Sequence, residues 1–162
     1  MAQSPDAQSF RFLYRQSEGV LGRAAWARAS AAPVAAVVVM TAIWLVIAPD
    51  APRDLAREPL IELSVVAEHL YFILYSFALI VCAVAEYFVS AKRFADRGRP
   101  PALAGLLPFS LLLAGAANWY QPRSEGGMPA ALTYVFDAVA IAIVVWNVAE
   151  LGFGAGRAGR PS

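Results

Sequence analysis

Four polar side chains lie inside or at the ends of strongly apolar stretches, where an ionisable group in lipid is energetically costly. They are Glu68, His69, Asn118 and Asp137. If the stretches are spanning helices, all four groups fall at similar depth, in the half of the membrane away from the chain termini. Such a cluster could relay protons, bind a cation, or join the helices by hydrogen bonds. The alternative is four separate, unconnected groups.

A second set of charged residues belongs to the opposite membrane boundary. Glu86 follows Glu68 by 18 residues, which is five full helical turns, so both carboxylates lie on one helix face about 27 Å apart. We expect Glu86 and Glu150 to form ion pairs with arginines there. Asp96 and Gly98 are typical of a turn, and the basic residues around them are expected to face anionic lipid. A cytoplasmic partner is the alternative.

Signatures of known enzymes are missing from the sequence. It has one His and one Cys, Cys82, and none of the common nucleophile, zinc or phosphate-binding motifs. We therefore expect no catalytic residues, no cofactor and no metal. A membrane-embedded metalloenzyme would have to hold its metal with His69, Glu68 and Asp137. A metal site normally takes three or four ligands, and one His is weak support for such a site.

The composition decides which elements carry these residues. A hydrophobic fraction of 59% and a mean hydropathy of +0.55 exceed the roughly 45–50% apolar content of soluble domains. They predict an all-α membrane protein, a four-transmembrane-helix bundle with cytoplasmic N- and C-termini. The expected parts are a cytoplasmic or interfacial segment (1–32), a membrane domain (33–152) with spans at about 33–49, 65–88, 102–120 and 130–151, and a disordered cytoplasmic tail (153–162).

The orientation follows from the basic residues, which concentrate in cytoplasmic segments of membrane proteins. Three of them, Arg53, Arg57 and Arg123, fall on one side of the four predicted spans. The other ten fall on the opposite side, which holds both termini: Arg11, Arg15, Arg23, Arg28, Lys92, Arg93, Arg97, Arg99, Arg157 and Arg160.

Three separated pieces of the chain are similar to one known family. They are Gly22-Arg23-Ala24-Ala25-Trp26 before the first span, Ala91-Lys92-Arg93-Phe94-Ala95-Asp96-Arg97-Gly98 after the second, and Trp146-Asn147-Val148-Ala149-Glu150-Leu151-Gly152-Phe153 at the end of the last. In order and spacing they resemble the bacterial inner-membrane family called domain of unknown function 805. The resemblance implies a multi-pass protein of the bacterial inner (plasma) membrane.

The chain departs from this family at several points. The family's usual loop His is Ala95 here, the aromatic pair after the loop glycine is replaced near Pro100, and the tail Gly154–Ser162 has no Asn or Asp. The family supplies no reaction. A candidate motif at the cytoplasmic face consists of Gly22, Arg23, Glu86, Lys92, Arg93, Asp96, Gly98 and Glu150.

Two functions are compatible with these features. The first is a non-enzymatic membrane protein with a structural or partner-binding role. Its expected partners are anionic headgroups at the cytoplasmic face and a second copy or another membrane protein. The alternative is a small oligomeric proton- or cation-coupled transporter that uses Glu68, His69 and Asp137. The net charge of +1 gives no reason to expect nucleic acid.

Topology reporters test the orientation directly. Tags at Ser4 and Gly98 should report the cytoplasm, and a tag at Gly126 the opposite compartment, because the ten basic residues remain inside. The measurement is protease or alkylation access in intact cells. If the Ser4 and Gly98 tags are found in different compartments, the four-span interpretation is wrong.

Overall fold

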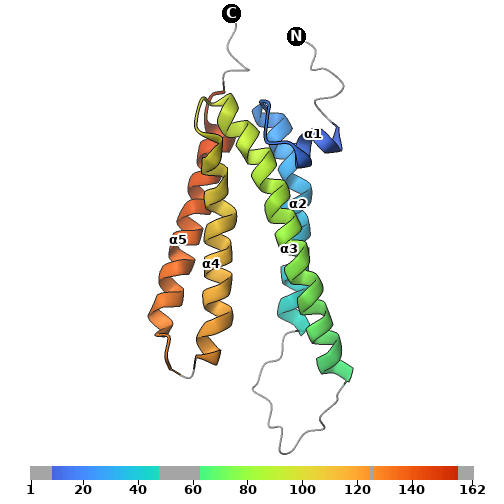
Figure 1. The fold of residues 1–162 in the computed structure, drawn as a ribbon, viewed down its shortest axis with the longest axis vertical. Helices are drawn as coiled ribbons and strands as arrows, with labels where there is room; N and C mark the ends of the chain where they lie inside the picture. Colours follow the sequence, from blue (N-terminus) through green and yellow to red (C-terminus); the bar gives the residue numbers. More distant parts are fainter. Residues whose placement is uncertain (1–8, 48–62, 125, 157–162) are drawn as a thin grey trace, which may run out of the picture. The chain divides into compact units, whose positions relative to one another are not determined.

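The part of the chain described by the computed structural model, residues 9–47, 63–124 and 126–156, is all-helical and contains no strand (Figure 1). The α-helices are α1 (Phe10–Arg15), α2 (Arg23–Ile47), α3 (Leu63–Asp96), α4 (Leu106–Tyr120) and α5 (Ala130–Val148). Two 3₁₀ turns, η2 (Pro101–Gly105) and η3 (Gln121–Arg123), flank α4, and a π-helical turn, η4 (Ala149–Phe153), follows α5.

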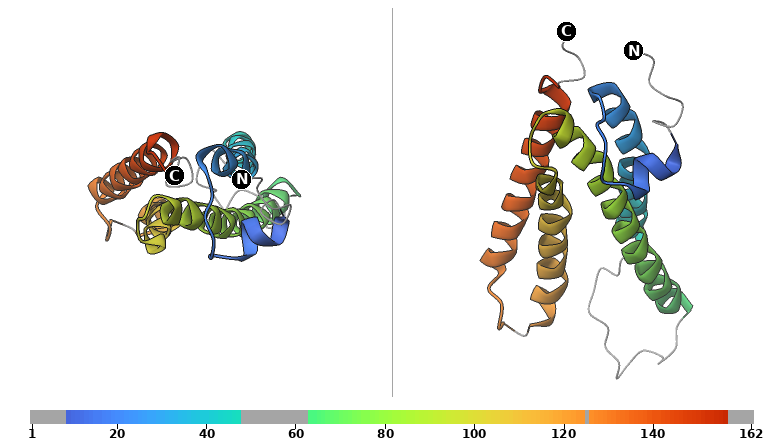
Figure 2. Two further views of the ribbon diagram at one scale, coloured as in Figure 1. Left: turned by 90° about the horizontal axis from the view of Figure 1, so that it is seen from above. Right: turned by 45° about the horizontal axis from the view of Figure 1, so that its top comes forward.

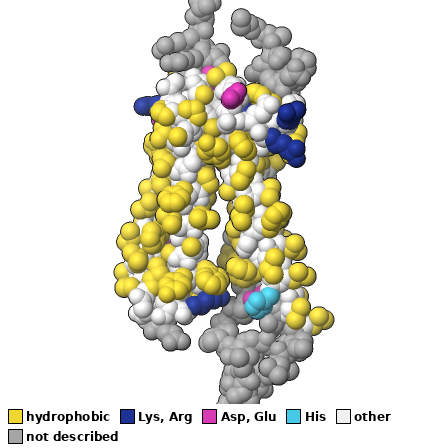
Figure 3. All heavy atoms as spheres, in the orientation of Figure 1, with side chains coloured by type: hydrophobic (Ala, Val, Ile, Leu, Met, Phe, Trp, Pro, Cys, Tyr) yellow, Lys and Arg dark blue, Asp and Glu magenta, His cyan; other side chains and the backbone are white. Residues whose placement is uncertain are grey.

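Four helical segments are long and apolar enough to cross a membrane: Arg23–Ile47, Val66–Asp96, Pro101–Arg123 and Ala130–Phe153. Large apolar side chains on them point outward; Val46 is 84% exposed and Phe77 67%. Figure 3 shows hydrophobic side chains over the long helices, with Lys and Arg toward the helix ends. Such surfaces suit hydrocarbon rather than water. The predicted all-α class is confirmed for the described residues, and so is the prediction of four helices long and apolar enough to cross a membrane.

The helix bounds differ from the predicted spans at the charged ends. α2 begins at Arg23 rather than near residue 33, and Pro33 lies inside it. α3 continues to Asp96 rather than stopping near residue 88, so the segment expected to be a basic loop is mostly helix. The predicted spans followed the apolar stretches, whereas α2 and α3 continue as helix into the charged residues beside them. Residues 1–8, 48–49 and 157–162 of the predicted segments lie outside the described residues.

The chain forms two compact units, and α2 and α3 contribute residues to both. Unit 2 comprises residues 31–83. In it, the Tyr71 hydroxyl donates to the Met40 carbonyl at 2.7 Å, and the Thr41 and Tyr75 hydroxyls are 2.8 Å apart. The Trp44 ring stacks on Tyr75 with centroids 6.2 Å apart. Hydrogen bonds and ring packing therefore join α2 to α3 within this unit.

Unit 1 comprises residues 1–30 and 84–162, and α4 and α5 lie side by side in it (Figures 1 and 2). Their buried positions repeat at three, four and seven residues, as in a helix–helix seam. They are Ser110, Ala114 and Ala117 on α4, and Thr133, Ala140 and Asn147 on α5. Small residues let the two backbones approach closely, so Ala114 and Ala117 of α4 serve the packing of α4 on α5.

The remaining core of unit 1 lies around the C-terminal turns of α3. Buried Ala91, Phe94, Ala104 and Leu151 form one cluster, and Leu21, Ala29 and Val89 form a second. Trp26 packs against both clusters. This core joins the start of α2, the end of α3 and η4, which position the charged residues discussed below.

α3 ends in a Schellman motif, in which two backbone bonds close the last turn around a residue with left-handed backbone. The Gly98 N–H donates to the Ala95 carbonyl and the Arg99 N–H to the Phe94 carbonyl, both at 2.9 Å. Gly98 has φ of 70°. The predicted turn role of Gly98 is thus confirmed.

Replacing Gly98 tests this helix end. Gly98→Ala should destabilise the protein by about 1–2 kcal/mol, because a Cβ is strained at positive φ. Unfolding by sodium dodecyl sulfate in mixed micelles measures the change. The matched control is Gly115→Ala within α4, where a Cβ meets nothing within 4 Å; it should be neutral or stabilising. Equal losses in both variants would contradict the role given to Gly98.

Candidate functional site

The last two turns of α3 carry three buried charges. Lys92 is fully buried, Arg93 is 1% exposed and Asp96 is 2% exposed. A buried charge is tolerated only when it is paired and hydrogen-bonded. The partners of Lys92, Arg93 and Asp96 therefore indicate the role of the C-terminal end of α3.

Lys92 binds backbone oxygens of the N-terminal segment. Its ammonium donates to the carbonyls of Leu13 at 3.1 Å and Phe88 at 3.0 Å, and also to the carbonyl of Gln16. These are the three bonds an ammonium can donate. The Phe12 ring lies 5.1 Å from Nζ and adds a cation–π contact. One buried lysine thus fastens α1 to α3.

Arg93 performs the same task for the C-terminal segment. Its Nε donates to the Leu151 carbonyl at 3.0 Å and its Nη2 to the Gly154 carbonyl at 2.7 Å. Its Nη1 donates to the Asp96 carboxylate, which supplies the counter-charge. The planar guanidinium can reach three acceptors at once, and the carbonyls it takes are those a helix end leaves without a partner.

These two residues correct one expectation from the sequence. Lys92 and Arg93 were expected to face anionic lipid, but both side chains are turned into the protein. The reason is the continuation of α3, which carries them into the core of unit 1 instead of a surface loop. Asp96, which is typical of a turn by its sequence, accepts a hydrogen bond from the Arg93 guanidinium.

Glu150 has the arginine partners predicted for it. Its Oε1 lies 3.1 Å from Arg97 Nη2 and 3.3 Å from Arg99 Nε, and Arg97 Nη1 also donates to the Glu150 carbonyl. The ion pairs join the end of α3 to η4. Arg99 is 60% exposed, so its share of the stabilisation is small.

Glu86 differs from the prediction. We expected arginines, but its Oε1 accepts hydrogen bonds from the Ser30 and Ser90 hydroxyls, each at 3.0 Å. Ser90 in turn accepts from Trp26 Nε1 at 3.3 Å. Glu86 Oε2 has no hydrogen-bond partner among the described residues. Nearby, burial and then the negative charge of Glu86 raise the pKa of Tyr14, whose hydroxyl donates to the Ala29 carbonyl at 2.8 Å.

The four polar residues that could form one cluster, Glu68, His69, Asn118 and Asp137, are found in both units. In unit 1, Asn118 Nδ2 donates to Asp137 Oδ1 at 2.8 Å and to the Ala114 carbonyl at 3.0 Å. Asn118 and Asp137 are therefore brought together, across the α4–α5 pair. Glu68 and His69 follow one another near the start of α3, in unit 2. Within the described residues, no group of three or more His, Cys, Asp or Glu side chains could hold a metal ion.

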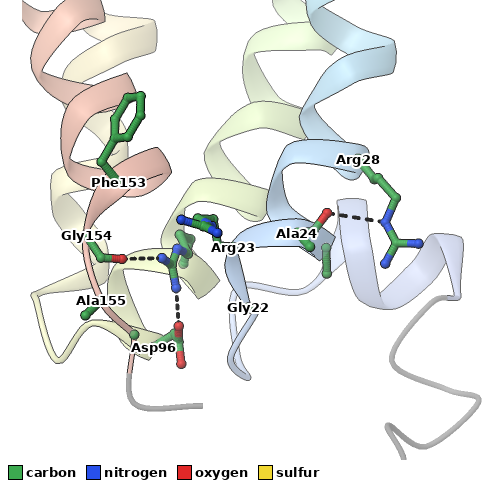
Figure 4. Close-up of a pocket in the computed structure, with 11 residues that line it drawn as sticks. Gly22, Arg23, Ala24, Arg28, Asp96, Phe153, Gly154 and Ala155 are labelled. Carbon is green, nitrogen blue, oxygen red and sulfur yellow. Dashed lines mark hydrogen bonds and ion pairs between the residues drawn. The ribbon is translucent and has the colours of Figure 1, made fainter. Parts of the chain in front are cut away.

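A pocket of about 490 Å³ opens beside Arg93 (Figure 4). It lies wholly within unit 1. Its lining comes from the start of α2, the end of α3 and the segment after η4: Gly22, Arg23, Ala24, Ala25, Arg28, Arg93, Asp96, Phe153, Gly154, Ala155 and Gly156. Three guanidinium groups and one carboxylate line it, so its charge is positive.

Several residues of this site were not found from the sequence. Ser30, Ser90 and the Trp26 ring nitrogen bind around Glu86, and the Leu13, Gln16, Leu151 and Gly154 carbonyls hold the buried cations. Serines next to apolar stretches were the one available signal for the Glu86 network. Carbonyl acceptors leave no signal, because every residue has one.

Comparisons with known proteins gave no relative. The chain matches no model of a protein family, no curated protein and no solved structure.

Removing the counter-charge of Arg93 tests the site's construction. Asp96→Ala should destabilise the protein by about 3–5 kcal/mol, because it leaves a buried guanidinium without its carboxylate. The control Arg99→Ala removes an exposed pairing and should cost about 0–1 kcal/mol. Detergent-induced unfolding of both variants measures this. A loss for Asp96→Ala no larger than for Arg99→Ala would contradict the structural role of the pair.

Proposed function

We propose that this chain is a non-enzymatic, multi-pass protein of the bacterial inner membrane with a structural or partner-binding role. In this proposal the four helices form one bundle with both termini in the cytoplasm. The observation that supports it most is that the cations at the end of α3 bind backbone carbonyls within the protein. Lys92, Arg93 and Arg97 donate to backbone carbonyls of the N- and C-terminal segments, as structural fasteners do.

The exposed arginines support the cytoplasmic placement of this end. Arg11, Arg15, Arg23 and Arg28 are exposed, and together with the buried cations they give the excess of positive charge typical of cytoplasmic segments. Anionic headgroups are the proposed partners of these four side chains. Membership of the family called domain of unknown function 805, which would fit such a protein, is part of the proposal and rests on the three similar sequence pieces.

The proposed macromolecular partner is a second copy or another membrane protein. The outward apolar faces offer the necessary surface, since helices in lipid associate by packing and by interhelical hydrogen bonds. One polar pair on α4 and α5, Asn118 with Asp137, also supports the alternative function, an oligomeric proton- or cation-coupled transporter.

Two conservative variants distinguish these functions. Asp137→Asn and Glu68→Gln remove the charges that a proton or cation would need, while keeping the side-chain size. The structural proposal expects no proton or solute flux in liposomes for either the wild type or the variants. It also expects a stability change for Asp137→Asn of about 1 kcal/mol or less, as for other hydrogen bonds in membranes. Wild-type flux that both variants abolish without loss of stability would establish the transporter instead.

A further inference from the structure

The pocket beside Arg93 holds more positive charge than the residues that line it neutralise. The one lining carboxylate, Asp96, is paired with Arg93. Arg23 has no ion-pair or hydrogen-bond partner among the described residues, and Arg28 uses only its Nε, which donates to the Ala24 carbonyl on its own helix at 3.3 Å. Within the part of the chain that the structure describes, two guanidinium groups around this cavity are therefore left without a counter-ion.

Arg93, the buried arginine of the pocket lining, has N–H groups that no acceptor in the described ranges of the chain uses. A guanidinium carries five N–H groups, and Arg93 uses three of them on Leu151, Gly154 and Asp96. Arg93 is 1% exposed and lines the cavity, so it is held rigidly in place. Figure 4 shows Arg23 on the side of α2 toward Asp96 and Gly154, the residues that Arg93 binds.

The start of α2 adds uncharged donors to the same wall. The first bond within the helix runs from the Trp26 N–H to the Gly22 carbonyl at 2.9 Å, so the N–H groups of Arg23, Ala24 and Ala25 precede any acceptor in the helix. All three residues line the pocket. A helix start favours negative charge, and here it acts together with three arginines.

We propose that this pocket binds a phosphate group. Arginine forks match phosphate oxygens in pairs, and the two guanidinium groups without a counter-ion balance one doubly charged phosphate or two phosphodiesters. The cavity of about 490 Å³ leaves room for the molecule that carries the phosphate. Phe153 also lines the pocket and is 79% exposed. An anionic phospholipid headgroup and a free phosphate share this chemistry. The inference rests on the proposed function only for placing the pocket at the cytoplasmic face.

The test uses the full-length chain purified in neutral, phosphate-free detergent. Thermal unfolding is followed while inorganic phosphate is added against sodium chloride at equal ionic strength. In a second arm, phosphatidylglycerol is added against phosphatidylcholine. We expect a saturable rise in Tm with phosphatidylglycerol and none with phosphatidylcholine. A saturable rise with inorganic phosphate alone would assign the site to a free phosphate. No saturable rise with either anion would overturn the proposal.

Variants separate a specific site from general surface charge. Arg23→Gln should weaken the apparent affinity about tenfold, the usual loss for one charge-assisted hydrogen bond, without lowering the Tm measured in the absence of anion. Arg123→Gln removes the same charge from an exposed position of η3, outside the pocket and away from the four arginines proposed to contact headgroups, and should leave the affinity unchanged. Equal losses in both variants would overturn the proposal. If Arg23→Gln fails to fold, Arg28→Gln replaces it with the same expectation.

Failure of this inference differs from failure of the proposed function. Binding in detergent does not depend on the orientation of the chain in the membrane. Reporters that place Gly98 outside the cytoplasm would therefore contradict the proposed topology without contradicting the phosphate site. Absence of binding would leave the topology and the flux results unaffected.

Discussion

Two buried cations that donate to backbone carbonyls hold the N- and C-terminal segments on the end of α3. Lys92 holds the N-terminal segment through the Leu13 and Gln16 carbonyls, and Arg93 holds the C-terminal segment through Leu151 and Gly154. Each cation adds hydrogen bonds to a short segment that also packs apolar side chains on the core, Phe12 and Leu13 in the first case and Leu151 in the second. An unpaired buried charge is strongly unfavourable. Undocking of α1 would therefore leave the Lys92 ammonium without its acceptors, and loss of the ammonium would remove the hydrogen bonds that hold α1.

This arrangement suits helices that keep most of their apolar surface on the outside. The spanning windows of α2 and α3 are each only 6% buried inside the protein, so the hydrophobic effect contributes little to packing one helix on another within the bilayer. Small-residue packing along α4 and α5, the hydroxyl bonds of Tyr71 and Tyr75, and the cation clusters take its place.

The sequence predicted the helices well and the side-chain partners poorly. Length, hydropathy and the breaks around Gly98 and Pro100 are properties of the chain alone, so four spanning helices could be recognised. The partners of Glu86 could not, because they depend on which face of α2 meets α3, and Ser30 rather than an arginine occupies that face. The pairing of Glu150 with an arginine could be predicted, since the predicted spans place Glu150 and several arginines at the same helix ends. The inward turn of Lys92 was not, because in sequence a lysine that binds carbonyls resembles one that faces lipid.

Hydrogen–deuterium exchange of Lys92→Met in lipid nanodiscs tests this account most directly. Methionine keeps the length of the side chain and removes its three donors. If the ammonium holds the N-terminal segment, the amides of α1 should exchange at least about tenfold faster than in the wild type, while those of α4 and α5 are unchanged. Unchanged protection in α1 would show that lipid or apolar packing, not the buried lysine, keeps this segment in place.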